Sequence, residues 1–144
     1  MKVFVVFLGM MLVSITFIAY QGDMAQYLRL QLAMKAAAEE AAAGAALYYD
    51  ERAYSQGFMV VDEEEAGKYV AYIAERAAAD MDLKGQERLE YVMEIHDDEK
   101  GYLKEGDSPS VTVTLTLHTE DLFRLSFLEV CRVSRGAEYE LEAY

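Results

Sequence analysis

The sequence predicts an α+β protein with a long N-terminal helix, a second, shorter helix and a small antiparallel sheet of three or four strands. Three observations support this fold class. An uncharged apolar stretch runs into an alanine-rich segment without a proline, a later segment repeats apolar residues at helical spacing, and the last third alternates apolar and polar residues. With 144 residues, the chain has room for one such domain.

Residues 3–20, VFVVFLGMMLVSITFIAY, contain no charged side chain. As a helix they measure about 27 Å, close to the roughly 30 Å hydrocarbon core of a bilayer. Lys2 precedes them and Asp23 follows, so the positive-inside tendency places the N terminus in the cytoplasm and the remaining chain outside. We therefore expect residues 1–22 to form a transmembrane or filament-core segment.

A cleaved signal peptide is the competing interpretation of the same residues. Its apolar region would be shorter, about 7–15 residues, and small residues would precede the cleavage site. Phe17 lies two positions before the candidate site at Ala19 and fits that pattern poorly.

Residues 23–50 are expected to continue the same helix, because they consist mostly of strong helix formers. One nearly continuous helix would then run from about Val3 to Tyr49, roughly 70 Å. Lys35 and Glu39 are four residues apart and can pair on one face. The alanines either allow other helices to approach closely or only maintain helicity. We favour the first alternative, in which the alanine-rich helix is packed on several of its sides.

Residues 51–144 are expected to form an acidic α+β head domain. Residues 50–61 read as a connection, and Asp62 with Glu65 forms a capping-box variant that starts the second helix. Gly85 is a plausible end for it. Its apolar face consists of Ala66, Tyr69, Val70, Ile73, Ala74, Ala77 and Met81.

Alternation then predicts strands. Leu89, Tyr91, Met93 and Ile95 share one face of the first, and residues 110–118, SVTVTLTLH, give the clearest strand. Residues 96–101 and 106–109 read as turns. Residues 119–128 fit either a short helix or a packed loop. The tail, 129–141, reads as a last strand with a bulge near Gly136.

The charge distribution limits the classes of partner. Only Lys2 of the 13 basic residues precedes the apolar stretch, so the remainder has 12 basic and 26 acidic residues, a net charge of −14. Nucleic-acid binding requires clusters of Lys and Arg, so we expect no nucleic-acid partner. Cys131 is the single cysteine, which rules out a disulfide within the chain.

We expect no enzyme, no cofactor and no metal site, because the sequence lacks a phosphate-binding, nucleophile-elbow or zinc motif. The densest group of possible metal ligands is 96–99, HDDE. It lacks the spacing of a calcium loop, and a solvated hairpin turn is the favoured interpretation. His118 and Cys131 have no evident catalytic partner in the sequence.

Residues 12–49, LVSITFIAYQGDMAQYLRLQLAMKAAAEEAAAGAALYY, resemble the N terminus of TadE/TadG-like proteins of tight-adherence pilus systems. Those proteins show an apolar span, an acidic residue just beyond it, a tyrosine, a Leu-Gln pair and an alanine-rich run ending in Ala-Gly-Ala. Residues 111–142 are similar to the sheet of TadE-like minor pilins. The matching N-terminal residues are Asp23, Tyr27, Leu30, Gln31, Ala36, Ala37, Ala43, Gly44 and Ala45.

The chain departs from the pattern of type IV-class prepilins. Those usually have a basic leader, a glycine before the cleavage site and a glutamate shortly after it. Gly9 is present here, but no glutamate follows it in the apolar stretch. The resemblance therefore does not extend to leader-peptidase processing or to the pairing of that acid with a neighbouring subunit's N terminus.

The resemblance implies a pilin-like structural subunit of an extracellular filament, a pilus or fimbria of the kind used in cell adhesion. It would polymerise through its apolar helix with its acidic head exposed. Its partners would be other copies of itself, the membrane before assembly, and the pilus assembly machinery. It would lie in the inner (cytoplasmic) membrane with its head outside, and then on the cell surface or in a secreted filament.

Two other functions stay open. The chain could be a membrane-anchored minor pseudopilin, or an accessory protein of assembly or secretion that does not form the filament. A membrane-anchored enzyme or sensor would have to use His96, His118 or Cys131. For a filament subunit, the residues expected to pack between helices during assembly are Val3, Phe4, Phe7, Leu8, Met11, Leu12, Ile15, Ile18, Ala33, Ala37, Ala41 and Gly44.

Overall fold

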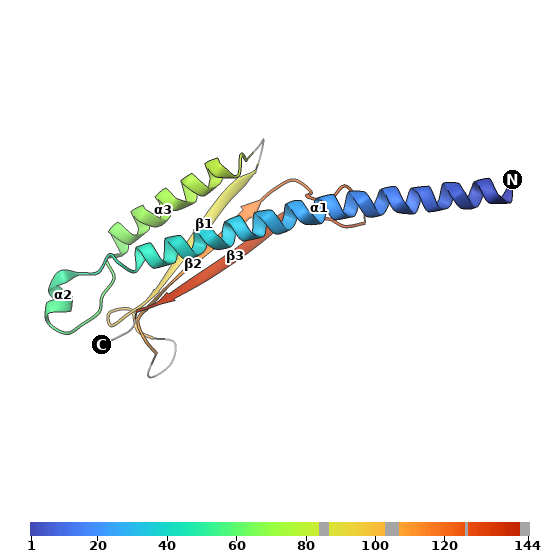
Figure 1. The fold of residues 1–144 in the computed structure, drawn as a ribbon. Helices are drawn as coiled ribbons and strands as arrows, with labels where there is room; N and C mark the ends of the chain where they lie inside the picture. The colour runs from blue at the N-terminus through green and yellow to red at the C-terminus, as the bar shows by residue number, and fades with distance from the viewer. Residues whose placement is uncertain (84–86, 103–106, 126, 142–144) are drawn as a thin grey trace.

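The computed structural model describes residues 1–83, 87–102, 107–125 and 127–141. In Figure 1 the C-terminal half of α1 lies against the sheet beside α3, and its N-terminal half projects away from this head. The predicted α+β architecture is confirmed, with three antiparallel strands along the described chain. The elements are α1 (Lys2–Ala45), α2 (Glu51–Ser55), α3 (Glu63–Asp80), β1 (Arg88–His96), β2 (Ser110–His118) and β3 (Arg132–Glu140).

Helix α1 has 44 residues, which corresponds to about 66 Å. The predicted continuous helix is confirmed, as is the Lys35–Glu39 ion pair (3.6 Å). The helix ends four residues earlier than expected because the chain after it forms another backbone pairing. Tyr49 and Val61 form an antiparallel bridge, flanked by a 2.8 Å hydrogen bond from the Asp50 N–H to the Val60 carbonyl.

The connection after α1 contains a short helix that the sequence did not predict. Asp50 caps α2, since its carboxylate accepts hydrogen bonds from the N–H groups of Arg52 and Ala53. Asp62 caps α3 in the same way and accepts from Glu64 and Glu65, as predicted. Only half of the capping box forms, because the Asp62 N–H donates to the Tyr48 carbonyl (2.8 Å).

Helix α3 presents the predicted apolar face to the core: five of its seven residues are buried, and Tyr69 and Met81 are half-buried. The helix ends at Asp80, and Asp82 adopts the left-handed conformation (φ 50°) that stops helices. Gly85, the predicted end, lies outside the described residues.

The sheet places apolar side chains on the face toward the helices. Val111, Val113, Leu115 and Leu117 of β2 are buried, while the opposite face has threonines on β2 and glutamates on both edge strands. The predicted bulge near Gly136 is wrong. Gly136 pairs in register with Thr114, and a Cβ there would lie 3.0 Å from the Thr114 hydroxyl oxygen, so the glycine gives room to that side chain.

The alanines of α1 make close packing possible in the head. Ala37, Ala38, Ala41, Ala42 and Ala45 are buried in the core that α1 shares with α3 and the sheet. At Gly44 the approach is closest, since a Cβ there would lie 2.0 Å from Cε1 of Tyr69. The small residues therefore serve packing within this chain, beyond maintaining helicity.

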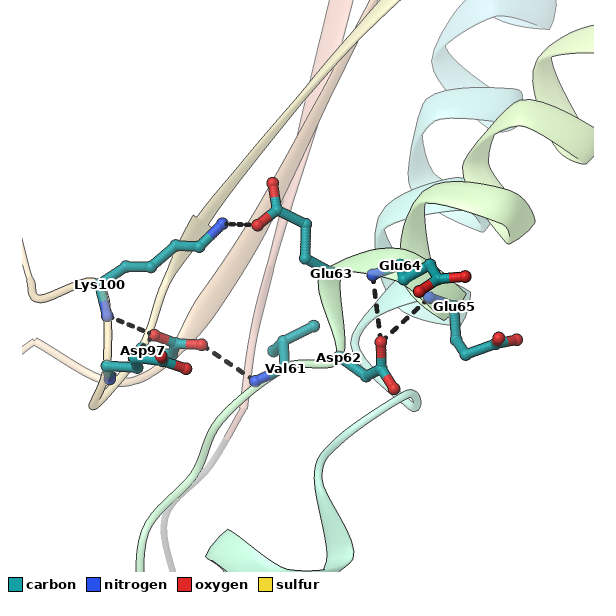
Figure 2. Close-up of polar contacts among 8 residues, drawn as sticks. Val61, Asp62, Glu63, Glu64, Glu65, Asp97 and Lys100 are labelled. Atoms are coloured by element: carbon teal, nitrogen blue, oxygen red, sulfur yellow. Dashed lines mark hydrogen bonds and ion pairs between the residues drawn. The ribbon is translucent and has the colours of Figure 1, made fainter.

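The expected solvated turn after β1 is wrong for Asp97, which is buried. Figure 2 shows its carboxylate between two segments: it accepts from the N–H of Val61 (2.9 Å) and from that of Lys100 (2.8 Å). Asp98 beside it accepts from the Tyr102 hydroxyl and the Met59 N–H, and these two hydrogen bonds lower the pKa of Asp98. The two aspartates thus fasten the turn to the 59–61 segment. Gly106 of the second predicted turn lies outside the described residues.

Two helix glycines give a matched test of this packing. We expect Gly44→Ala to destabilise the folded chain by about 1–3 kcal/mol, because Tyr69 must move out of the core. Gly67→Ala is the control, since its new Cβ would meet only Met93 Cε at 3.9 Å, and it should stabilise α3 by about 0.5–1 kcal/mol. Urea unfolding of both variants in detergent measures the two shifts. A neutral Gly44→Ala would contradict the close approach.

Candidate membrane and assembly surface

The first part of α1, up to residue 18, is exposed along its whole length. In its most apolar 18-residue window, mean hydropathy is 2.5 and no residue is buried within the chain. By length and composition this helix is sufficient to cross a membrane. The predicted assembly residues here are all exposed, from 45% for Leu8 to 84% for Val3: Val3, Phe4, Phe7, Leu8, Met11, Leu12, Ile15 and Ile18.

This segment is apolar on every side, with no polar stripe that would suit a water-exposed helix. The hydroxyl groups of its serine and its threonine are satisfied within the helix. Ser14 donates to the Met10 carbonyl and Thr16 to the Leu12 carbonyl, each at 2.9 Å. A helix with its polar groups satisfied and apolar side chains all around suits lipid or a bundle of similar helices.

Where the helix enters the head, Asp23 joins it to the β2–β3 loop. Asp23 is 2% exposed, and its Oδ2 accepts from the backbone N–H of Arg124 (3.0 Å). Its Oδ1 accepts from Nε of the same arginine (2.9 Å) and forms an ion pair with Nη2 (2.8 Å). The backbone hydrogen bond and then the guanidinium hydrogen bond lower the pKa of Asp23, so the carboxylate is charged in the folded chain.

Aromatic packing reinforces this junction. The ring of Phe123 lies 6.2 Å from that of Tyr20 and 6.0 Å from that of Tyr27, so one buried side chain contacts two turns of α1. The loop itself is held by Asp121, whose Oδ1 accepts from the N–H groups of Phe123 and Val130 (3.1 Å each). Of the two predicted alternatives for 119–128, its described residues form the packed loop.

A line of exposed residues continues the apolar surface past the junction. Ala25, Leu28, Leu32 and Ala36 recur at three- and four-residue spacing and are exposed on α1, with Leu32 at 68%. Sequence reasoning missed this surface, which we call the α1 stripe. The three- and four-residue spacing in the sequence indicates the α1 stripe only when the residues of α1 that face the head are known.

The remaining predicted assembly residues lie within the part of α1 that packs on the head, and they differ in exposure. Ala33 is exposed and lines an open cavity of about 750 Å³ beside Asp23, Arg29 and Asp80. Ala37 and Ala41 are buried in the head, and Gly44 is covered by Tyr69. Their assignment to contacts between subunits is therefore corrected: they pack against α3 and the sheet of their own chain.

His118 and Cys131, two of the candidate catalytic side chains, each contact a glutamate of the fold. His118 Nε2 lies 3.2 Å from a Glu90 carboxylate oxygen across the β1–β2 pair. Desolvation and the Glu129 carboxylate raise the pKa of the exposed Cys131 thiol, the opposite of what a nucleophilic cysteine needs. Over the described residues, no three His, Cys, Asp or Glu side chains are grouped to hold a metal ion.

Comparison with protein-family models, curated proteins and solved structures finds no match for this chain. The resemblance to TadE/TadG-like proteins therefore stays a prediction from the quoted residues.

The junction predicts a pH dependence. Because the folded-state pKa of Asp23 lies below its ordinary 3.8, the carboxylate stabilises the fold above that pH, and the stabilisation is lost as the pH falls through the folded-state pKa. We expect Asp23→Asn to be less stable than the wild type at pH 7, with the gap closing below pH 3.8. Denaturant unfolding across this pH range checks it. Glu75→Gln, at an exposed position on α3, is the control. A gap that does not change with pH would contradict the charged junction.

Proposed function

We propose that this chain is a membrane-inserted, pilin-like subunit that polymerises into an extracellular filament through α1. The observation that best supports this is that α1, a single helix, is packed against the head at one end and exposed at the other. One face of the helix between residues 34 and 46 is buried in the head core, while every residue from 1 to 18 is exposed. The two halves are parts of one unbroken helix, so whatever shelters the apolar half also fixes the position of the head.

Before assembly, lipid would surround residues 3–20. During assembly, neighbouring copies of the same segment would replace lipid, which costs little because one apolar environment is exchanged for another. Tight packing between helices then favours the polymer. The exposed Phe4, Leu8, Met11 and Ile15 would provide the contacts in the filament core.

The α1 stripe would extend these contacts into the head region, where burial removes apolar surface from water. Fully burying a leucine side chain contributes about 1.5–3 kcal/mol. Leu28 and Leu32 therefore favour association in a region where the helix is no longer in lipid. They take over the assembly role that was predicted for Ala37 and Ala41.

The head would form the outer surface of the filament. The sheet face opposite the helices bears Glu90, Glu94 and Glu138 beside threonines. The net charge of −14 on the chain after residue 22 (12 basic minus 26 acidic residues) keeps such a surface hydrated and makes neighbouring heads repel. Salt screens that repulsion, so higher ionic strength should favour the polymer.

Electron microscopy of material sheared from cells, with mass spectrometry of the same fraction, tests the proposal. We expect filaments that contain this chain with its N-terminal peptide. Recovery only from detergent-extracted membranes would contradict polymerisation and favour the anchored accessory protein. A secreted chain that begins after Ala19 would establish the signal peptide instead.

A matched pair of variants tests the α1 stripe in the same assay. Leu32→Glu should abolish filaments with an unchanged amount of folded protein in the membrane, because a carboxylate would be buried between subunits. Val92→Glu, on the exposed face of edge strand β1, is the control and should assemble normally. Normal filaments from Leu32→Glu would exclude the α1 stripe from the interface.

A further inference from the structure

Phe127 is the most exposed aromatic side chain among the described residues, at 80%. Of the six phenylalanines, three lie in the apolar segment, Phe123 is buried and Phe58 lies beyond α2. A single exposed apolar residue is ordinary on a protein surface. Phe127 is of interest because of its position in a turn, where the Leu128 N–H donates to the Leu125 carbonyl (2.9 Å).

The loop holding Phe127 lies where the apolar segment ends. Figure 1 shows the β2–β3 connection extending from the sheet along α1 toward the N-terminal end. Its Arg124 is bonded to Asp23, and its Phe123 packs on Tyr20, the last residue of the uncharged stretch. With residues 3–20 in a bilayer, this loop is at the level of the lipid headgroups.

We propose that the Phe127 turn is a second membrane contact, inserted into the boundary between headgroups and acyl chains on the outer face of the bilayer. The inference rests on the membrane insertion of α1 and does not need polymerisation. Half-buried Leu125 and Leu128 flank the exposed ring and add apolar surface on the same turn. Aromatic side chains favour this interfacial level, where Tyr20 of α1 also lies.

Two membrane contacts would restrain the orientation of the molecule more than one membrane-spanning helix does. A single span leaves rotation about its own axis free, whereas interfacial anchors help to fix the tilt and rotation of a membrane helix. The Asp23–Arg124 and Tyr20–Phe123 contacts couple the turn to α1, so its insertion would restrain the tilt of α1 and select the side of the head that faces the bilayer.

The chain contains no tryptophan, so single substitutions give clean fluorescence reporters. Three full-length variants would be reconstituted at low protein density in phosphatidylcholine vesicles, with and without brominated acyl chains: Phe127→Trp, Phe7→Trp within the apolar segment, and Phe58→Trp near the distal end of the head. We expect bromine to quench most of the fluorescence of Phe7→Trp and Phe127→Trp. Emission of both should be blue-shifted relative to Phe58→Trp, whose fluorescence should be unchanged by bromine.

The Phe7→Trp variant separates the two ways of failing. Quenching of Phe7→Trp with Phe127→Trp behaving like Phe58→Trp would overturn the second contact and leave membrane insertion intact. Absence of quenching at Phe7→Trp would contradict insertion itself, and with it both proposals. Quenching at all three positions would show that the head lies on the membrane non-specifically, which would also overturn the assignment to the Phe127 turn.

Discussion

Residues 3–18 of α1 form an apolar surface on every side of the helix and cannot stay exposed to water, and the remaining structure is built around that constraint. The same helix forms one wall of the head core, so the apolar segment is a continuation of the fold. Lipid and neighbouring helices both satisfy the constraint at similar free energy, so the proposed exchange of lipid for neighbouring copies costs little.

The junction at Asp23 makes the two halves of the molecule act as one body. The contact between this charged, buried carboxylate and Arg124, with two hydrogen bonds and an ion pair, is costly to break, because separation would leave the carboxylate unpaired in a desolvated position. Phe123 adds apolar packing at the same level. The β2–β3 loop therefore fixes the direction in which α1 leaves the head, and it places Phe127 beside the end of the apolar segment.

Local patterns predicted most of the secondary structure. The alternation in β2, the Asp62 cap and the apolar face of α3 arise from neighbouring residues, so the sequence contains the necessary information. The wrong predictions concern residues whose surroundings are formed by distant parts of the chain. Asp97 reads as solvated until it contacts Val61, and Gly136 reads as a bulge until Thr114 lies opposite it. Ala37 and Ala41 suit contacts between subunits equally well, until α3 and the sheet are seen to cover them.

The topology of the chain in intact cells most directly tests whether α1 is buried in the membrane with the head outside. In a Cys131→Ser background, Ser55→Cys places a single exposed thiol on α2, at the end of the head farthest from the N terminus. We expect a membrane-impermeant maleimide to label this thiol on intact spheroplasts, and we expect the labelled chain to stay in the membrane after an alkaline wash. Labelling only after lysis, or release by the wash, would contradict an apolar helix buried in the membrane with its head outside.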